Sequence, residues 1–377
     1  MKRAAPWRSH ATRRIACITF GVLLAAGLAL HATSAPADEA WGAGPRPVLP
    51  GINARELALI INDADPLSVR VGEYYRLRRH IPRANILHVR LAAAPVLSAA
   101  EFARVKEVVE ARTPARVQAY ALAWTEPYRV ACMSVTSAFA YGFDPRFCTV
   151  GCRRTPMSPY FDSDTRRPFG DLHMRPTMML AARDWAHAKA LIDRGVAADE
   201  SFPLGTAYLL DTDDKQRDVR AATFTTADRW ANARVRVRIL SSDALRDRSD
   251  VLFYFTGLTR VAGLDTLHFL PGAIADHLTS FGGELIGSTQ MSSLAWLEAG
   301  ATASYGTVVE PCNFPQKFPS VPIVMRRYLA GETLIEAYWK SVAEPSQGVF
   351  IGEPLARPFA RSAEARRFAA ASAQGPP

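Results

Sequence analysis

The 377-residue chain contains none of the short motifs that mark the common nucleotide-dependent and metal-dependent enzymes. It has no GxxxxGK[ST] phosphate loop, no GxGxxG dinucleotide fingerprint and no HExxH zinc motif. It also lacks the GxSxG turn that presents the nucleophile of α/β-hydrolases. We therefore predict no cofactor and no metal ion.

The chain also has little concentrated charge. It shows no dense basic run interleaved with aromatic residues, so nucleic-acid binding is disfavoured. Its formal net charge of +9 arises from 45 basic and 36 acidic residues. Five of the basic residues and none of the acidic ones lie in residues 1–37, so the remaining 340 residues carry 40 minus 36, or +4.

The first 37 residues have the three-part pattern of a secretory signal peptide. Five Lys and Arg residues precede an apolar stretch from Ile15 to Leu30, and Ala35-Pro36-Ala37 forms an A-x-A site, so we predict cleavage before Asp38. A retained anchor is the alternative, but the apolar stretch is shorter than the ~20 residues of a membrane span. The Arg13-Arg14 pair weakly resembles a twin-arginine signal, but ordinary Sec export is the simpler interpretation. We expect a periplasmic or extracellular protein with no transmembrane span after cleavage.

Cysteine is scarce, with five residues, of which Cys17 lies in the signal. Four cysteines therefore remain after cleavage. An even number in an exported protein predicts disulfides, here two, for which three pairings are possible. The spacing of Cys148 and Cys152 also fits one half of a zinc site, but no second close ligand pair accompanies it. None of the four has a histidine near it in sequence, which disfavours a catalytic thiol. The four cysteines that remain are Cys132, Cys148, Cys152 and Cys312.

The chain after residue 56 has the alternating pattern of an α/β protein. Leu57–Asn62 is an apolar run typical of a strand covered on both faces. Asp65-Pro66 then supplies an N-cap and a first-turn proline for a helix, and Ile86–Leu91 is the next strand. This β-α-β order predicts a largely parallel sheet flanked by helices in three layers. We assign residues 38–56 to a linker, 57–360 to one large domain and 361–377 to a loose tail.

Further elements follow the same pattern. Ser98-x-x-Glu101 and Thr333-x-x-Glu336 are capping boxes, each predicting the start of a helix. Asp184–Arg194 reads as a helix with Gly195 as its stop. Residues 125–176 show no periodicity and hold three of the four cysteines, so we expect a long, disulfide-tied loop excursion. Other strands are expected at 116–124, 204–210, 235–240, 251–256 and 348–352.

In open α/β sheets, ligands bind beyond the carboxyl ends of the parallel strands. Polar residues that follow apolar runs are therefore candidates for binding, although each also fits a turn or a helix cap that merely ends its strand. The candidates are Asn62, Asp63, Trp124 to Glu126, Asp211, Thr256, Gly257 and Glu310.

A second set of candidates would be catalytic. Asp276, His277 and Ser280, with Glu310, contain the residue types of a hydrolase site. Adjacent Asp and His side chains generally point apart, however, so Asp276 and His277 are not expected to serve each other. His277 also fits a histidine whose hydrogen bonds are satisfied within the fold.

Several long segments stand out, from INDADPLSVRVGEYYRLRRHIPRANIL in the first β-α-β unit to GVFIGEPLARPF near the end of the domain. They resemble a family of exported bacterial proteins that occur in species carrying exosortase, the enzyme proposed to sort proteins with a PEP-type C-terminal signal. The resemblance covers nearly the whole chain after the signal. This chain shows no PEP-type tail, so the resemblance implies an accessory protein rather than a sorted cargo. The matching segments are INDADPLSVRVGEYYRLRRHIPRANIL, MMLAARDW, PGAIADHLTSFGG, WLEAGATASYGTVVEPCNFPQKFP, GETLIEAYWKSV and GVFIGEPLARPF.

The last third contains the strand GATASYG (300–306) and closes with the turn Gly352-Glu353-Pro354. In these features it is similar to the second half of the gingipain- and caspase-like cysteine peptidase fold, so we expect either a caspase- or gingipain-like or a Rossmann-like three-layer sandwich. In those peptidases His-Gly follows one strand and a nucleophilic Cys follows the next. Thr256-Gly257 stands where His-Gly is expected, and no Cys lies between Leu267 and Gly283. Because a Cys-His dyad needs both members, we predict no cysteine-peptidase activity.

Two hypotheses for function follow. The first is an exported accessory module that binds a peptide, a glycan or an envelope protein at its strand ends, without turnover, in exosortase-type sorting or exopolysaccharide export. The second is a hydrolase that uses a non-cysteine catalytic set drawn from Asp276, His277, Ser280 and Glu310.

Overall fold

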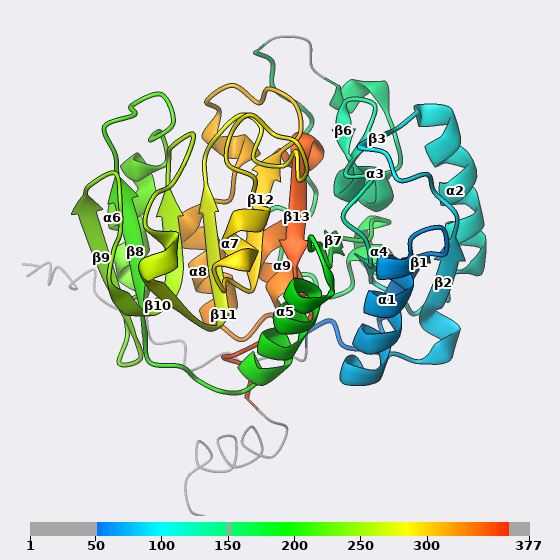
Figure 1. The fold of residues 1–377 in the computed structure, drawn as a ribbon, viewed down its shortest axis with the longest axis horizontal. Helices are drawn as coiled ribbons and strands as arrows, with labels where there is room; N and C mark the ends of the chain where they lie inside the picture. The colour runs from blue at the N-terminus through cyan, green and yellow to red at the C-terminus, as the bar shows by residue number, and fades with distance from the viewer. Residues whose placement is uncertain (1–50, 149–151, 362–377) are drawn as a thin grey trace, which may run out of the picture. The chain divides into compact units, whose positions relative to one another are not determined.

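The computed structural model describes residues 51–148 and 152–361. Within these residues ten strands form one sheet, from β2 at one edge to β9 at the other, in the order β2-β1-β4-β7-β13-β12-β11-β10-β8-β9 (Figure 1). The α/β class and the largely parallel sheet with helices on its faces are as predicted.

The sheet consists of two five-stranded halves that run in opposite directions. Pairing within each half is parallel, and the single antiparallel pair, β12 with β13, joins the halves. The carboxyl ends of the two halves therefore lie at opposite ends of the strands. The first half contains β2 (Ile86–Val89), β1 (Leu57–Asn62), β4 (Ala119–Leu122), β7 (Thr177–Met179) and β13 (Gly348–Gly352); the second contains β12 (Ala303–Thr307), β11 (Leu267–His277), β10 (Arg248–Thr256), β8 (Gly205–Asp211) and β9 (Val235–Ser241).

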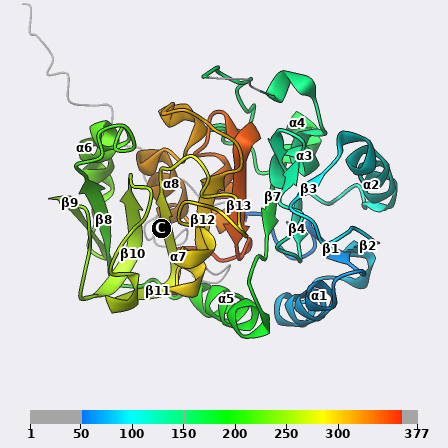
Figure 2. The ribbon, with the colours of Figure 1, turned by 45° about the horizontal axis from the view of Figure 1, so that its top comes forward.

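Helices cover both faces of the sheet, giving three layers. On one face, α1 (Pro66–Arg79), α6 (Phe224–Ala227), α8 (Val321–Leu329) and α9 (Leu334–Trp339) share one hydrophobic core with the strands. On the other face lie α2 (Ala99–Arg112), α3 (Val135–Tyr141) and α7 (Leu294–Glu298). Helix α5 (Trp185–Ala198) contributes to cores on both faces and packs beside α1 (Figure 2).

Local signals in the sequence explain several helix starts. The Asp65 carboxylate accepts a hydrogen bond from the backbone N–H of Leu67, with Pro66 in the first turn of α1. The capping box of Ser98 and Glu101 opens α2, and that of Thr333 and Glu336 opens α9. These three predictions are confirmed.

The predicted stop of α5 at Gly195 is wrong, because the helix continues to Ala198. A Cβ at position 195 would lie 2.5 Å from Cγ of Glu353. The glycine therefore allows the helix to approach the end of β13, and it does not terminate the helix.

The segment 125–176 is more regular than its sequence suggested. It contains α3, the short helix α4 (Pro168–Leu172) and two strands, β5 (Arg129–Val130) and β6 (Met133–Ser134). Strand β5 pairs both with β6 and with β3 (Val96–Leu97), and the three form a small second sheet. Helix α3 is buried from Val135 to Ala140 and has no solvent-exposed face over these residues. Its sequence therefore lacks the regular alternation of apolar and polar residues that identifies a surface helix.

The four described cysteines form two disulfides, and the predicted number is confirmed. Cys132 bonds to Cys148 and Cys152 to Cys312, with Cα–Cα distances of 5.4 and 5.5 Å. The second bond connects residues separated by 160 positions and fixes the loop after β12 to the excursion. Among the described residues no helix is long and apolar enough to span a membrane.

Candidate functional site

The opposed halves of the sheet separate the predicted binding residues into two groups. Asn62, Asp63 and Glu126 follow strands of the first half, whereas Asp211, Thr256, Gly257 and Glu310 follow strands of the second. Because the halves run in opposite directions, the two groups belong to opposite ends of the sheet. Any single site can use only one of them.

A polar pocket of about 420 Å³ lies at the carboxyl ends of the second half. Its wall combines the loop after β8, the turn after β11 and the segment after β12. Most of the lining side chains can form hydrogen bonds, and the Cys152–Cys312 disulfide forms part of the wall. The lining residues are Cys152, Gln216, Arg217, Leu278, Thr279, Ser280, Glu310, Pro311, Cys312 and Asn313.

Arg217 is the cationic group of this pocket. One of its terminal nitrogens, Nη1, donates to Asp214 at 2.8 Å, while its Nε is buried and has no partner. The loop that carries Arg217 lies so close to Gly257 that a Cβ there would be 2.0 Å from the Arg217 carbonyl oxygen. Because Gly257 has no side chain, the backbone of Arg217 can lie directly against the end of β10. This explains why glycine occupies this position.

Asp276 points to the face of the sheet covered by α9 and is fully buried. It pairs with Arg220 at 2.6 Å and accepts a hydrogen bond from the Tyr338 hydroxyl at 2.8 Å. Burial raises the pKa of the Asp276 carboxyl, and the neighbouring guanidinium opposes that rise. These contacts are those of a structural ion pair.

His277 points to the other face, as the alternation of side chains along β11 requires. Its Nδ1 accepts a hydrogen bond from Nε1 of Trp296 at 2.9 Å, so its Nε2 carries the proton and donates to the carbonyl oxygen of Met291 at 3.1 Å. Burial lowers the pKa of His277 to about 3. The imidazole is therefore held neutral with both nitrogens occupied, and it has no free nitrogen to act as a base.

Of the four residues proposed as a catalytic set, the structure brings Ser280 and Glu310 to the pocket. Ser280 accepts a hydrogen bond from the Thr307 hydroxyl through its backbone carbonyl at 2.8 Å. Glu310 is exposed and accepts from the backbone N–H of Cys312 at 2.7 Å. The site is thus left with a hydroxyl and a carboxylate but without the imidazole.

The remaining binding candidates have identifiable local contacts. The Asn62 side chain bonds both backbone groups of Leu91 and is buried. Asp63 pairs with His88 at 2.7 Å, and burial raises the pKa of Glu126. At the other end of the strands, the Thr256 carbonyl oxygen accepts from Arg220 at 2.9 Å.

Sequence reasoning missed Arg217 and its neighbour Asp218, which lie in the acidic loop after β8. Asp211 and Asp218 share Lys215, at 2.6 and 3.5 Å. Burial and the nearby Asp211 raise the pKa of Asp218 to about 6. The cluster of acidic and basic residues from Asp211 onward was visible in the sequence. That this loop lies beside the turn after β11 follows only from the fold.

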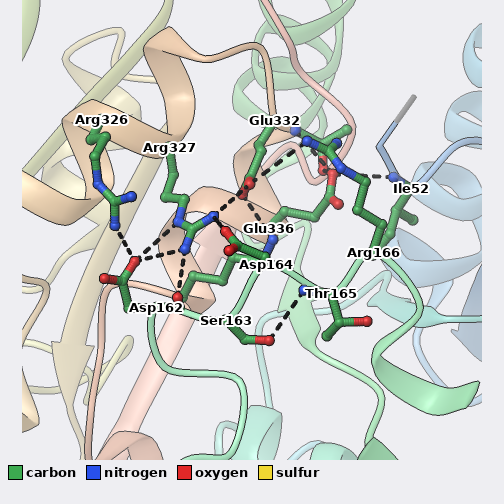
Figure 3. A network of polar contacts seen from close by, with 12 residues as sticks. Ile52, Asp162, Ser163, Asp164, Thr165, Arg166, Arg326, Arg327, Glu332 and Glu336 are labelled. Carbon is green, nitrogen blue, oxygen red and sulfur yellow. Dashed lines mark hydrogen bonds and ion pairs between the residues drawn. The ribbon is translucent and has the colours of Figure 1, made fainter. Parts of the chain in front are cut away.

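A network of buried charges ties the start of the described chain to α8 and α9 (Figure 3). The Glu336 carboxylate accepts from the backbone N–H of Ile52 at 3.1 Å, and Glu332 pairs with Lys340 at 3.1 Å. Arg327 contacts Glu332 at 3.3 Å and the carboxylates of the 162–164 loop. These groups pair with one another inside the fold, so we assign them a structural role.

The described residues contain no cluster of three or more His, Cys, Asp or Glu side chains arranged to hold a metal ion. Comparisons of the chain with protein-family models, with curated proteins and with solved structures gave no match.

Proposed function

We propose that this protein is an exported, non-catalytic binding protein that holds a carboxylate-bearing ligand in the pocket at the carboxyl ends of β8, β11 and β12. The observation that carries the proposal is the composition of this pocket. Its guanidinium pairs with Asp214 through one nitrogen, Nη1, and hydroxyl, amide and carboxylate groups surround it. A planar guanidinium presents several donors and is suited to a carboxylate, and the surrounding groups are suited to hydroxyls or amides.

The arrangement of possible catalytic groups favours binding over turnover. Both cysteines in the pocket wall are joined in a disulfide, and a disulfide sulfur is not a nucleophilic thiolate. The His277 imidazole, which a hydrolase would need as its base, is occupied by Trp296 and Met291. The pocket therefore offers recognition chemistry without an activated nucleophile.

The resemblance to exported proteins of exosortase-carrying species supports a place for this binding in protein sorting or exopolysaccharide export. A peptide C-terminus and an acidic sugar each carry a carboxylate. The ligand class is thus a peptide or a glycan with an accessible carboxylate.

Calorimetric titration of the purified protein tests the proposal. The ligands are uronic-acid oligosaccharides and short peptides with free or amidated C-termini. We expect saturable binding by one ligand class, weakened about tenfold or more in Arg217→Gln because a charge-assisted contact is lost. Lys215→Gln is the matched control, since this exposed cation lies two residues away and is not part of the pocket wall. Equal affinity of both variants for the ligand would remove Arg217 from the site.

A further inference from the structure

A second pocket, of about 560 Å³, lies between the edge strand β2 and helix α2. One wall is the end of β2 and the residues after it, from His88 to Ala92. The other wall is a stripe along α2 formed by Glu101, Arg104, Val105, Val108 and Arg112. The helical spacing of these five residues places them on one side of α2, so the pocket is a groove parallel to the sheet edge.

The backbone of β2 faces this edge with unpaired groups. Strand β2 pairs with β1 alone in the described sheet, with Ile61 opposite His88 and Asn62 opposite Val89. The Val89 carbonyl oxygen accepts from the backbone N–H of Asp63 and therefore points toward β1. Because backbone groups alternate in direction along a strand, the N–H and C=O of His88 point away from β1.

The side chains of the groove carry more positive than negative charge. Within the part of the chain that the structure describes, Arg90, Arg104 and Arg112 form no ion pair, although all three line the groove. The wall also holds two acidic residues, Asp63, which pairs with His88, and Glu101, which belongs to the capping box of α2, so three arginines face two carboxylates. Val108, which is 44% exposed, adds an apolar contact between the guanidiniums.

We propose that an acidic, extended segment of a partner protein adds to β2 as a further strand and fills this groove. The outward N–H and C=O groups of β2 form hydrogen bonds with the backbone of such a segment, as a neighbouring strand would. The arginines favour a segment with acidic side chains. Every second side chain of an added strand faces α2. The segment recognised therefore carries its acidic and apolar residues at every second position, where their side chains face α2.

Fluorescence anisotropy with the full chain tests the proposal. The probe is a labelled peptide of about eight residues, with Glu and Val alternating at every second position and Ser between them. We expect Arg104→Glu to weaken binding about tenfold or more, because it reverses a charge in the groove. Arg238→Glu is the control, since Arg238 is an exposed arginine on the other edge strand, β9, and its replacement should leave affinity unchanged.

Two substitutions at one position test the added strand itself. His88→Pro removes the outward N–H, which an edge strand tolerates, and should abolish binding. His88→Gln changes the same side chain but keeps the N–H, so the further loss of binding in His88→Pro measures the contribution of the N–H itself. If His88→Pro does not fold, a probe methylated on the backbone nitrogens that face β2 makes the same test and should not bind. Equal binding to Arg104→Glu, equal binding of the methylated probe, or tighter binding of a single-stranded oligonucleotide would each overturn the proposal.

Discussion

The neutral, buried state of His277 predicts a specific loss of stability in mild acid. Its pKa is about 3 in the folded protein and 6.5 ordinarily, so the unfolded chain takes up the proton first as the pH falls. The stability that His277 contributes is fully present above about pH 6.5 and is lost as the pH falls toward the folded value. Linkage between these pKa values gives a loss of about 2 kcal/mol between about pH 7 and about pH 5.

The measurement is urea denaturation of the original chain and of His277→Gln at several pH values in this range. Glutamine does not titrate, so the advantage of the original chain over the variant should shrink by about 2 kcal/mol across the range. His268→Gln serves as a control, because His268 lies on the same strand with an exposed side chain and its replacement should leave the pH profile unchanged. A pH-independent difference between the original chain and His277→Gln would refute the reasoning.

Three further predictions concern the framework of the pocket. Asp276→Leu alone should lower the free energy of unfolding by about 3–5 kcal/mol, because it leaves Arg220 buried without its partner, whereas adding Arg220→Met should restore most of that loss. Replacing Cys152 and Cys312 together by serine should lower the free energy of unfolding by about 4 kcal/mol, measured by urea denaturation, because the bond closes a long loop. Gly257→Ala should cost about 1–3 kcal/mol and weaken ligand binding in calorimetry, because the added methyl displaces the Arg217 backbone.

Each of these predictions has an outcome that contradicts it. A single Asp276→Leu variant as stable as the original chain would show that the ion pair is not structural. Unchanged stability of the double serine variant would mean that the loop after β12 is held by other contacts. Unchanged stability and unchanged ligand affinity of Gly257→Ala would show that this close contact does not hold the Arg217 backbone in place.

Local features of the sequence predicted local structure well. The apolar run before Asn62 and the Asp65-Pro66 pair defined a strand and a helix start because these signals act over a few residues. Gly195 predicted the wrong helix end because its small size serves a contact with Glu353, far away in sequence. Tertiary packing of this kind leaves no periodic trace in the chain.

The candidate site was only partly accessible from the sequence, for the same reason. Ser280 was selected as the hydroxyl of a possible hydrolase set and Glu310 because it follows a strand, and the structure places both at one pocket. The sequence did not predict the reversal of strand direction between β12 and β13, because an apolar run does not indicate whether its strand pairs in parallel or antiparallel. Arg217 was missed because its contact with Gly257 depends on a loop that returns to the sheet.

The central claim is that the pocket around Arg217 binds its ligand without transforming it. The most direct test incubates the full chain with the ligand that calorimetry identifies and follows the mass of the ligand by mass spectrometry over many hours. The account predicts saturable binding that requires Arg217 and a ligand recovered with its mass unchanged. Multiple turnover of the ligand by the original chain, lost in Ser280→Ala or Glu310→Gln, would contradict it.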